Sequence, residues 1–238
     1  MALPPDASLI PASWKALPLM FVVVLGVAHD VLLTLADALA PLLGTGSVAG
    51  AVVVFTACVR LALVPLGYAQ ARAEVVRARI APQVSRVRAR YAKDPQRMAR
   101  ELAALHRESG ISMFAGVLPA LAGVPFLFLT YRLFSGDQDL LGHTLAGAPL
   151  GLHPVAGLGG PHVLVLVGLL ALIAGVAYRQ YRVAAAVADA PKLVRWLPFG
   201  TVVTAAFVPL AAGVYLLTST AWTTVERPLL RRIAIARV

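Results

Sequence analysis

The segment from Ser47 to Tyr68 reads SVAGAVVVFTACVRLALVPLGY and carries a single charged residue, Arg60. A helix of about 20 mostly apolar residues is long enough to cross the hydrocarbon core of a bilayer. The segment therefore predicts the first confident transmembrane helix, at about 47–68. Its arginine is the most unusual residue of the chain, because charged side chains are costly inside a membrane.

The composition of the whole chain agrees with a membrane protein. Of its 238 residues, 59% are hydrophobic and 13% are charged, whereas an ordinary soluble domain has roughly 25% charged residues. The mean hydropathy of +0.80 excludes a disordered chain. Cys58 is the single cysteine, so neither an internal disulfide nor a cysteine-rich metal site can form.

Basic residues are concentrated in three segments that alternate with apolar ones. The chain carries 21 Lys and Arg and a formal net charge of +10, and most of this charge lies in 70–113, 179–195 and 227–238. The loop 135–160 has no Lys or Arg. By the positive-inside rule, the three basic segments face the cytoplasm and this loop faces outward. No DNA-recognition motif accompanies the charge, so we expect no DNA partner.

These patterns predict an all-α membrane protein with five transmembrane helices, an N-terminal interfacial helix and a cytoplasmic helical hairpin. The predicted spans are about 47–68, 114–134, 161–182, 193–208 and 210–227, in a core that runs from 47 to 238. The last two spans turn near Pro209, and their shortness implies a thinned membrane. In the hairpin, 70–113, apolar residues repeat every three or four positions and the repeat breaks at Lys93-Asp94-Pro95.

The N-terminal segment, 1–46, is apolar but contains His29, Asp30 and Asp37. Two acids in one lipid-exposed span are unfavourable. We therefore expect an amphipathic helix at about 27–42 that lies in the membrane interface. A sixth span at 17–36 stays open as the alternative.

Arg60 lies roughly 18 Å along the helix from Val48 and roughly 9 Å from Leu66, in the inner half of the membrane. Its guanidinium either snorkels to the inner headgroups or turns into a water-filled cavity. The last span carries Thr218 and Ser219 in a hydroxyl-rich stretch that should reach the depth of Arg60. Such hydroxyls often bond to their own backbone instead.

Metal and cofactor sites are not expected. The spacings of His143, His153 and His162 match no helical or hairpin ligand pattern, so we interpret them as solvated. The ten basic residues of the hairpin could serve topology alone, or contact anionic lipid headgroups or ribosomal RNA.

The order of several short motifs resembles the YidC-family membrane protein insertases of the oxidase-assembly superfamily. The motifs are Arg60 followed by LALVPL, then IAPQ from Ile80, DPQR from Asp94, Leu118-Pro119, VPF from Val124, FVPLAAGVY from Phe207, TSTAW from Thr218, and Arg231-Arg232. Together they cover about residues 15–233. The chain departs from the pattern before and within the second span, where Ser112-Met113, Gly116-Val117 and Gly123 replace the usual residues, and resembles a short, divergent bacterial member.

The resemblance implies five spans around a hydrophilic groove that opens to the cytoplasm and to lipid. It places Arg60 in this groove, together with Gln180 and Trp222. The implied function is insertion of nascent membrane proteins in the plasma membrane without nucleotide hydrolysis or covalent chemistry. Anionic lipids, the ribosome and a Sec translocon are the further partners it suggests. A transporter or anion channel, and an assembly factor that holds partner helices without inserting them, remain the alternatives.

Overall fold

The computed structural model describes residues 12–110, 142–157, 159–185 and 195–237. The predicted span 114–134 lies outside these residues. The chain divides into two compact units, and the division falls inside the helices α2, α8, α10 and α11. Unit 1 comprises 1–55, 128–170 and 203–215, and unit 2 comprises 56–127, 171–202 and 216–238.

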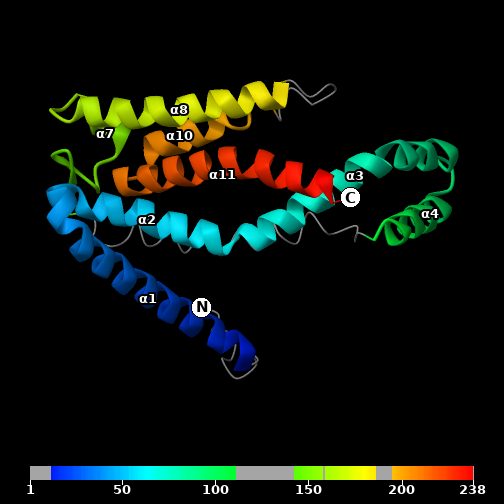
Figure 1. Ribbon diagram of the computed structural model, residues 1–238, viewed down its shortest axis with the longest axis horizontal. Helices are drawn as coiled ribbons and strands as arrows, with labels where there is room; N and C mark the ends of the chain where they lie inside the picture. The colour runs from blue at the N-terminus through cyan, green and yellow to red at the C-terminus, as the bar shows by residue number, and fades with distance from the viewer. Residues whose placement is uncertain (1–11, 111–141, 158, 186–194, 238) are drawn as a thin grey trace, which may run out of the picture. The chain divides into compact units, whose positions relative to one another are not determined.

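In unit 1, the N-terminal helix α1 (Ala12–Leu43) is followed by one 3-10 turn, η2 (Gly44–Gly46), and by α2 (Ser47–Ala62). Gly44 ends α1 in the left-handed conformation, with a φ of +54°. The chain changes direction there (Figure 1). A Cβ on Gly50 would meet the Leu43 side chain, so the start of α2 packs closely on the end of α1. Helix α1 is longer than the interfacial helix predicted at 27–42, and whether it lies flat or crosses the membrane stays a prediction.

Unit 1 also contains a small folded loop. Strands β1 (Thr144–Leu145) and β2 (Ala148–Pro149) form an antiparallel hairpin, followed by the short helix α7 (Pro154–Gly157). Ala146 and Gly147 both have positive φ, which is typical of a two-residue turn that matches strand twist. This hairpin within the loop 135–160 was not predicted from the sequence.

The folded loop holds the beginning of α11 (Leu210–Ala236). The first N–H groups of a helix have no partner within it, and here Leu210 N donates to Leu152 O at 2.9 Å and Ala211 N to Leu150 O at 2.9 Å. Leu150 is fully buried. The loop therefore supplies the backbone cap of this helix.

In unit 2, α2 ends at Ala62 and α3 (Val64–Arg90) begins almost at once. Pro65 has no N–H to give to the carbonyl of Leu61, which interrupts the helical hydrogen-bond ladder. Leu63 N still donates to Val59 O at 3.0 Å, so the interruption is brief. The end of the predicted span 47–68 and the first arm of the predicted hairpin thus share one helix.

Helices α3 and α4 (Pro95–Glu108) form the hairpin and run side by side (Figure 1). Asp94 caps α4 because its carboxylate accepts from Arg97 N at 3.0 Å, and Pro95 occupies the first turn. This break coincides with the predicted one. At the other end, Gly110 leaves the helix with a φ of +68°.

The first half of α3 packs on the last half of α11. Ala71, Leu230 and Ala234 are buried together, and Tyr68 packs against them. A Cβ on Gly67 would lie 3.0 Å from Glu226 Oε1 and 3.1 Å from Leu230 Cδ1, so glycine permits this close approach.

The remaining described helices are α8 (Val163–Ala185) and α10 (Phe199–Phe207). Helix α10 is shorter than the predicted span 193–208, because a turn at Leu197 and Pro198 precedes it. The chain then turns at Val208 and Pro209, where the sequence predicts a turn. Among the described residues, Gly26–Ala62 and Val163–Ala185 are long and apolar enough to cross a membrane.

Candidate functional site

Arg60 occupies the last turn of α2 and is half-buried. Its guanidinium Nη2 donates a hydrogen bond to the hydroxyl of Ser219 on α11. Ser219 is 5% exposed, so the arginine reaches a buried polar group on another helix of unit 2. The contact is charge-assisted, which makes it stronger than a bond between two neutral groups.

The guanidinium of Arg60 retains hydrogen-bonding capacity. Its Nε is buried and has no hydrogen-bond partner among the described residues. Glu74 of unit 2 forms an ion pair with Arg227 instead, at 2.7 Å. The charge of Arg60 is therefore not neutralised by a carboxylate in the described part of unit 2.

Most hydroxyls of the stretch after Ser219 bond to their own helix. Thr220 Oγ1 donates to Leu216 O at 2.6 Å, and Thr223 Oγ1 donates to Ser219 O at 2.9 Å. These bonds agree with the interpretation that hydroxyls in this stretch bond to their own backbone. Thr218 is half-buried, and its place in the site stays a prediction.

Gln180 joins α8 to α11. Its Nε2 donates to Thr224 Oγ1 at 2.7 Å and to Thr220 O at 3.3 Å. The neighbouring Arg179 donates through Nη1 to Thr224 O at 3.3 Å. The Gln180 amide nitrogen thus donates its hydrogen bonds within the protein.

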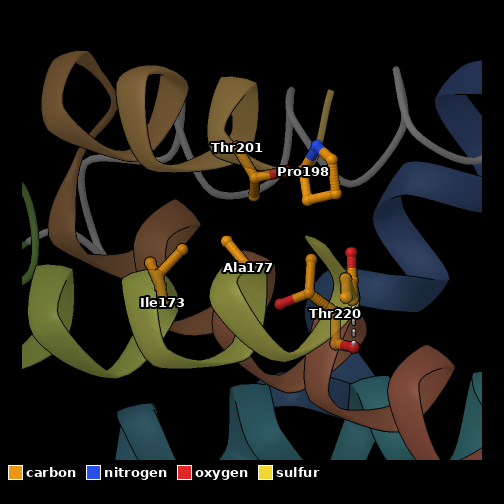
Figure 2. A pocket seen from close by; sticks show the side chains of 6 residues that line it. Ile173, Ala177, Pro198, Thr201 and Thr220 are labelled. Atoms are coloured by element: carbon orange, nitrogen blue, oxygen red, sulfur yellow. Dashed lines mark hydrogen bonds between the residues drawn. The ribbon is translucent and has the colours of Figure 1, made fainter. Parts of the chain in front are cut away.

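Gln180 also borders a small pocket between α8, α10 and α11. Figure 2 shows Ile173 and Ala177 on one side and Pro198 and Thr201 on the other, with Thr220 at one end. The lining is half apolar and half polar, and its polar groups come from Gln180 and the two threonines. Arg60 does not line this pocket. The predicted site residues Arg60 and Gln180 therefore meet α11 in different places.

Trp222 lies one turn after Ser219 on the same side of α11, since residues three apart are neighbours on a helix. Its side chain is half-buried, and its indole Nε1 is buried without a hydrogen-bond partner among the described residues. A buried indole N–H normally has a partner. Arg60 Nε and Trp222 Nε1 are thus two hydrogen-bond donors near Ser219 that have no partner among the described residues. Their chemistry suits a bound molecule that carries hydrogen-bond acceptors.

The hydrogen-bond partners of Gln180, Thr220 and Thr224, were not predicted from the sequence. Thr220 and Thr224 are four residues apart and therefore share one face of α11. That spacing could have indicated a polar contact to a neighbouring helix. The ion pair of Glu74 with Arg227 had no comparable signal, because it requires knowing that α3 lies beside α11.

Apolar helices and a half-buried arginine that bonds to a hydroxyl on a neighbouring helix are consistent with an α-helical membrane protein. A family described as 60Kd inner membrane protein matches residues 39–236 of the chain. The match covers more than half of the sequence, and the chain belongs to this family. The resemblance to YidC-family proteins is thereby confirmed.

Several curated relatives are similar over shorter stretches. The membrane protein insertase YidC of Clostridium perfringens is 32% identical over 87 residues, which is 37% of this chain and 37% of that protein. The YidC protein of Aquifex aeolicus is 33% identical over 96 residues, 40% of this chain and 19% of the relative. The chloroplastic ALBINO3-like protein 1 of Arabidopsis thaliana is 33% identical over 89 residues, 37% and 18% of the two chains. The alignments thus span well under half of each relative.

Proposed function

We propose that this protein is a membrane protein insertase. It takes segments of a nascent membrane protein into a polar groove open to the cytoplasm and releases their apolar helices into the bilayer. Membership of the 60Kd inner membrane protein family supports this function, as do the names of the YidC and ALBINO3-like relatives. The half-buried Arg60, bonded to Ser219 and without a described carboxylate partner, is the observation that carries it.

The groove in this proposal is enclosed by five spans, at about 47–68, 114–134, 161–182, 193–208 and 210–227. Arg60, Ser219, Thr218, Gln180 and Trp222 line it. The two free donors on Arg60 and Trp222 support substrate contact at this position. Gln180 contributes to the groove from α8, because its amide nitrogen donates a hydrogen bond to Thr224 on α11.

The physical basis of insertion is a shortened hydrophobic crossing. Arg60 attracts an acidic or polar outer segment of the substrate part of the way into the membrane, where the local low dielectric strengthens the attraction. Short spans thin the surrounding bilayer and reduce the distance that remains. The apolar helix of the substrate then enters lipid, and the burial of its apolar surface supplies the free energy. No nucleotide, cofactor or covalent step is needed, so the protein is not an enzyme in this scheme.

The orientation follows from charge. The chain spans the bacterial plasma membrane several times, with the hairpin 70–113 and the C-terminus in the cytoplasm. The exposed arginines of α3 and α4 support contact of the hairpin with anionic lipids or with ribosomal RNA. A Sec translocon is a further candidate partner of the protein.

Reconstituted insertion tests the function. Purified protein in proteoliposomes should insert a small membrane protein that has a short acidic outer tail, detected as protease protection. We expect Arg60→Ala to lower the insertion rate about tenfold, equivalent to one charge-assisted hydrogen bond of about 1.5 kcal/mol. Arg60→Lys should retain part of the rate, and Arg86→Ala, an exposed hairpin arginine, should retain nearly all of it.

The same assay separates the alternative functions. An anion transporter would leave insertion unchanged in Arg60→Ala and alter chloride flux into the liposomes. An assembly factor would cross-link to its partner helices from position 222 without raising their protection from protease. Equal insertion by the wild type and Arg60→Ala would contradict the proposed role of this arginine.

A further inference from the structure

Four aromatic side chains gather where α8 approaches α10. Tyr181 lies at the centre, with ring centroids 5.2 Å from Trp196, 6.0 Å from Phe199 and 6.5 Å from Tyr178. Trp196 and Phe199 also contact each other, at 5.4 Å. All four residues belong to unit 2, and we call them the aromatic cluster.

The aromatic cluster is not a buried core. Trp196 is 59% exposed and Tyr178 is 55% exposed, and the adjacent Leu197 is 70% exposed. Clustered aromatic residues in a soluble protein would normally be covered, because they bury a large apolar area. Exposure of amphipathic rings is instead typical of the membrane interface, where the ring meets acyl chains and the polar edge meets headgroups and water.

Arginines border the aromatic cluster. Arg179 and Arg182 are exposed and lie on α8 beside Tyr178 and Tyr181. The apolar part of α8 precedes them, so the helix changes from apolar to basic at this level. Basic side chains at this position complement the negative surface of the cytoplasmic leaflet.

We propose that the aromatic cluster, with Arg179 and Arg182, is a binding surface for the headgroups of anionic phospholipids in the cytoplasmic leaflet. The rings lie at the level of the headgroups and the two arginines bind lipid phosphates. The surface fixes the depth of α8, and with it the depth at which Gln180 meets α11. It is separate from the hairpin and does not depend on insertion activity.

Fluorescence of one tryptophan tests this surface directly. The substitutions Trp14→Phe and Trp222→Phe leave Trp196 as the single tryptophan of the full chain. The protein is reconstituted into vesicles of phosphatidylcholine alone or mixed with phosphatidylglycerol. We expect a nitroxide at the headgroup to quench Trp196 more strongly than a nitroxide deep in the acyl chains.

Charge dependence separates headgroup binding from simple burial. In the Arg179→Gln/Arg182→Gln variant, the preference of this region for phosphatidylglycerol should weaken about fivefold for each arginine replaced. The preference is measured as enrichment of nitroxide-labelled phosphatidylglycerol around Trp196. The Arg86→Gln/Arg88→Gln variant loses the same charge from the hairpin and should leave the signal unchanged.

Three outcomes would overturn the proposal. Aqueous iodide could quench Trp196 as strongly as free tryptophan, which would place the cluster in water. The deep nitroxide could be the stronger quencher, which would place it in the hydrocarbon core. Ribosomes could shield Trp196 from iodide while lipids do not, which would make the cluster an RNA-binding surface.

Discussion

At the scale of single residues, the bond between Arg60 and Ser219 is the contact whose loss should be most visible. Ser219→Ala removes the acceptor of a half-buried guanidinium, and we expect it to lower the free energy of unfolding by about 1 kcal/mol. Thermal unfolding in detergent measures this change. Thr223→Val is the matched control, because its hydroxyl bonds to its own helix and its loss should cost less. A larger loss in the control than in Ser219→Ala would contradict the importance of the contact.

Gln180 offers a second test at this scale, based on the direction of its hydrogen bonds. Its Nε2 donates to the carbonyl of Thr220, so a carboxylate in its place would set two acceptors against each other. Gln180→Glu should therefore destabilise the protein more than Gln180→Leu, by about 1 kcal/mol or more. Unfolding of both variants in the same detergent gives the comparison. The reverse order would show that the amide does not hold α11 through this carbonyl.

The site residues differ in how far sequence alone could place them. Arg60 and Ser219 could be paired because each lies on an apolar segment at a depth that residue counting estimates. The contacts of Gln180 could not be predicted, since they depend on the rotation of α8 about its own axis, which helix–helix packing decides. Gln180 entered the site through resemblance, and its bonds to Thr220 and Thr224 required the structure.

At the scale of elements, local chemistry accounts for the helix ends and tertiary contacts account for the rest. The break before α4 follows from a capping aspartate and a proline, and both are readable in the sequence. The β1–β2 hairpin is different, because its turn consists of Ala146 and Gly147 rather than a strong turn pair such as Asn-Gly. Likewise, α3 begins at Val64 and continues to Arg90, well past the predicted end of the span at Tyr68.

The packing of α8 on α11 in unit 1 leads to a prediction about Gly213. A Cβ there would lie 2.7 Å from Leu169 Cδ2, closer than real contacts allow, and Leu169 is itself buried. Gly213→Ala should therefore lower the free energy of unfolding by about 1–3 kcal/mol, the usual cost of overpacking. Gly168→Ala is the control on α8, where a Cβ meets nothing within 4 Å and alanine favours the helix. Thermal unfolding of the two variants decides, and equal stability would mean that Leu169 moves aside freely.

At the scale of the whole molecule, charge distribution should decide which segments face the cytoplasm. The hairpin carries ten basic residues, whereas the loop 135–160 carries none. Positive segments stay on the cytoplasmic side. The polar site around Arg60 can accept a substrate from the cytoplasm only in that orientation. The predicted topology and the proposed function therefore both depend on the difference in charge between the hairpin and the loop.

Cysteine labelling tests this orientation, because the chain has one cysteine to remove. In a Cys58→Ser background, Val155→Cys adds a thiol to the folded loop at a position that is 49% exposed, and Lys93→Cys adds one at the exposed turn of the hairpin. A membrane-impermeant maleimide added to spheroplasts should label position 155 at once and position 93 only after the membrane is permeabilised. Labelling of position 93 in intact spheroplasts would reverse the topology, and it would place the hairpin where neither ribosomes nor nascent chains could meet it.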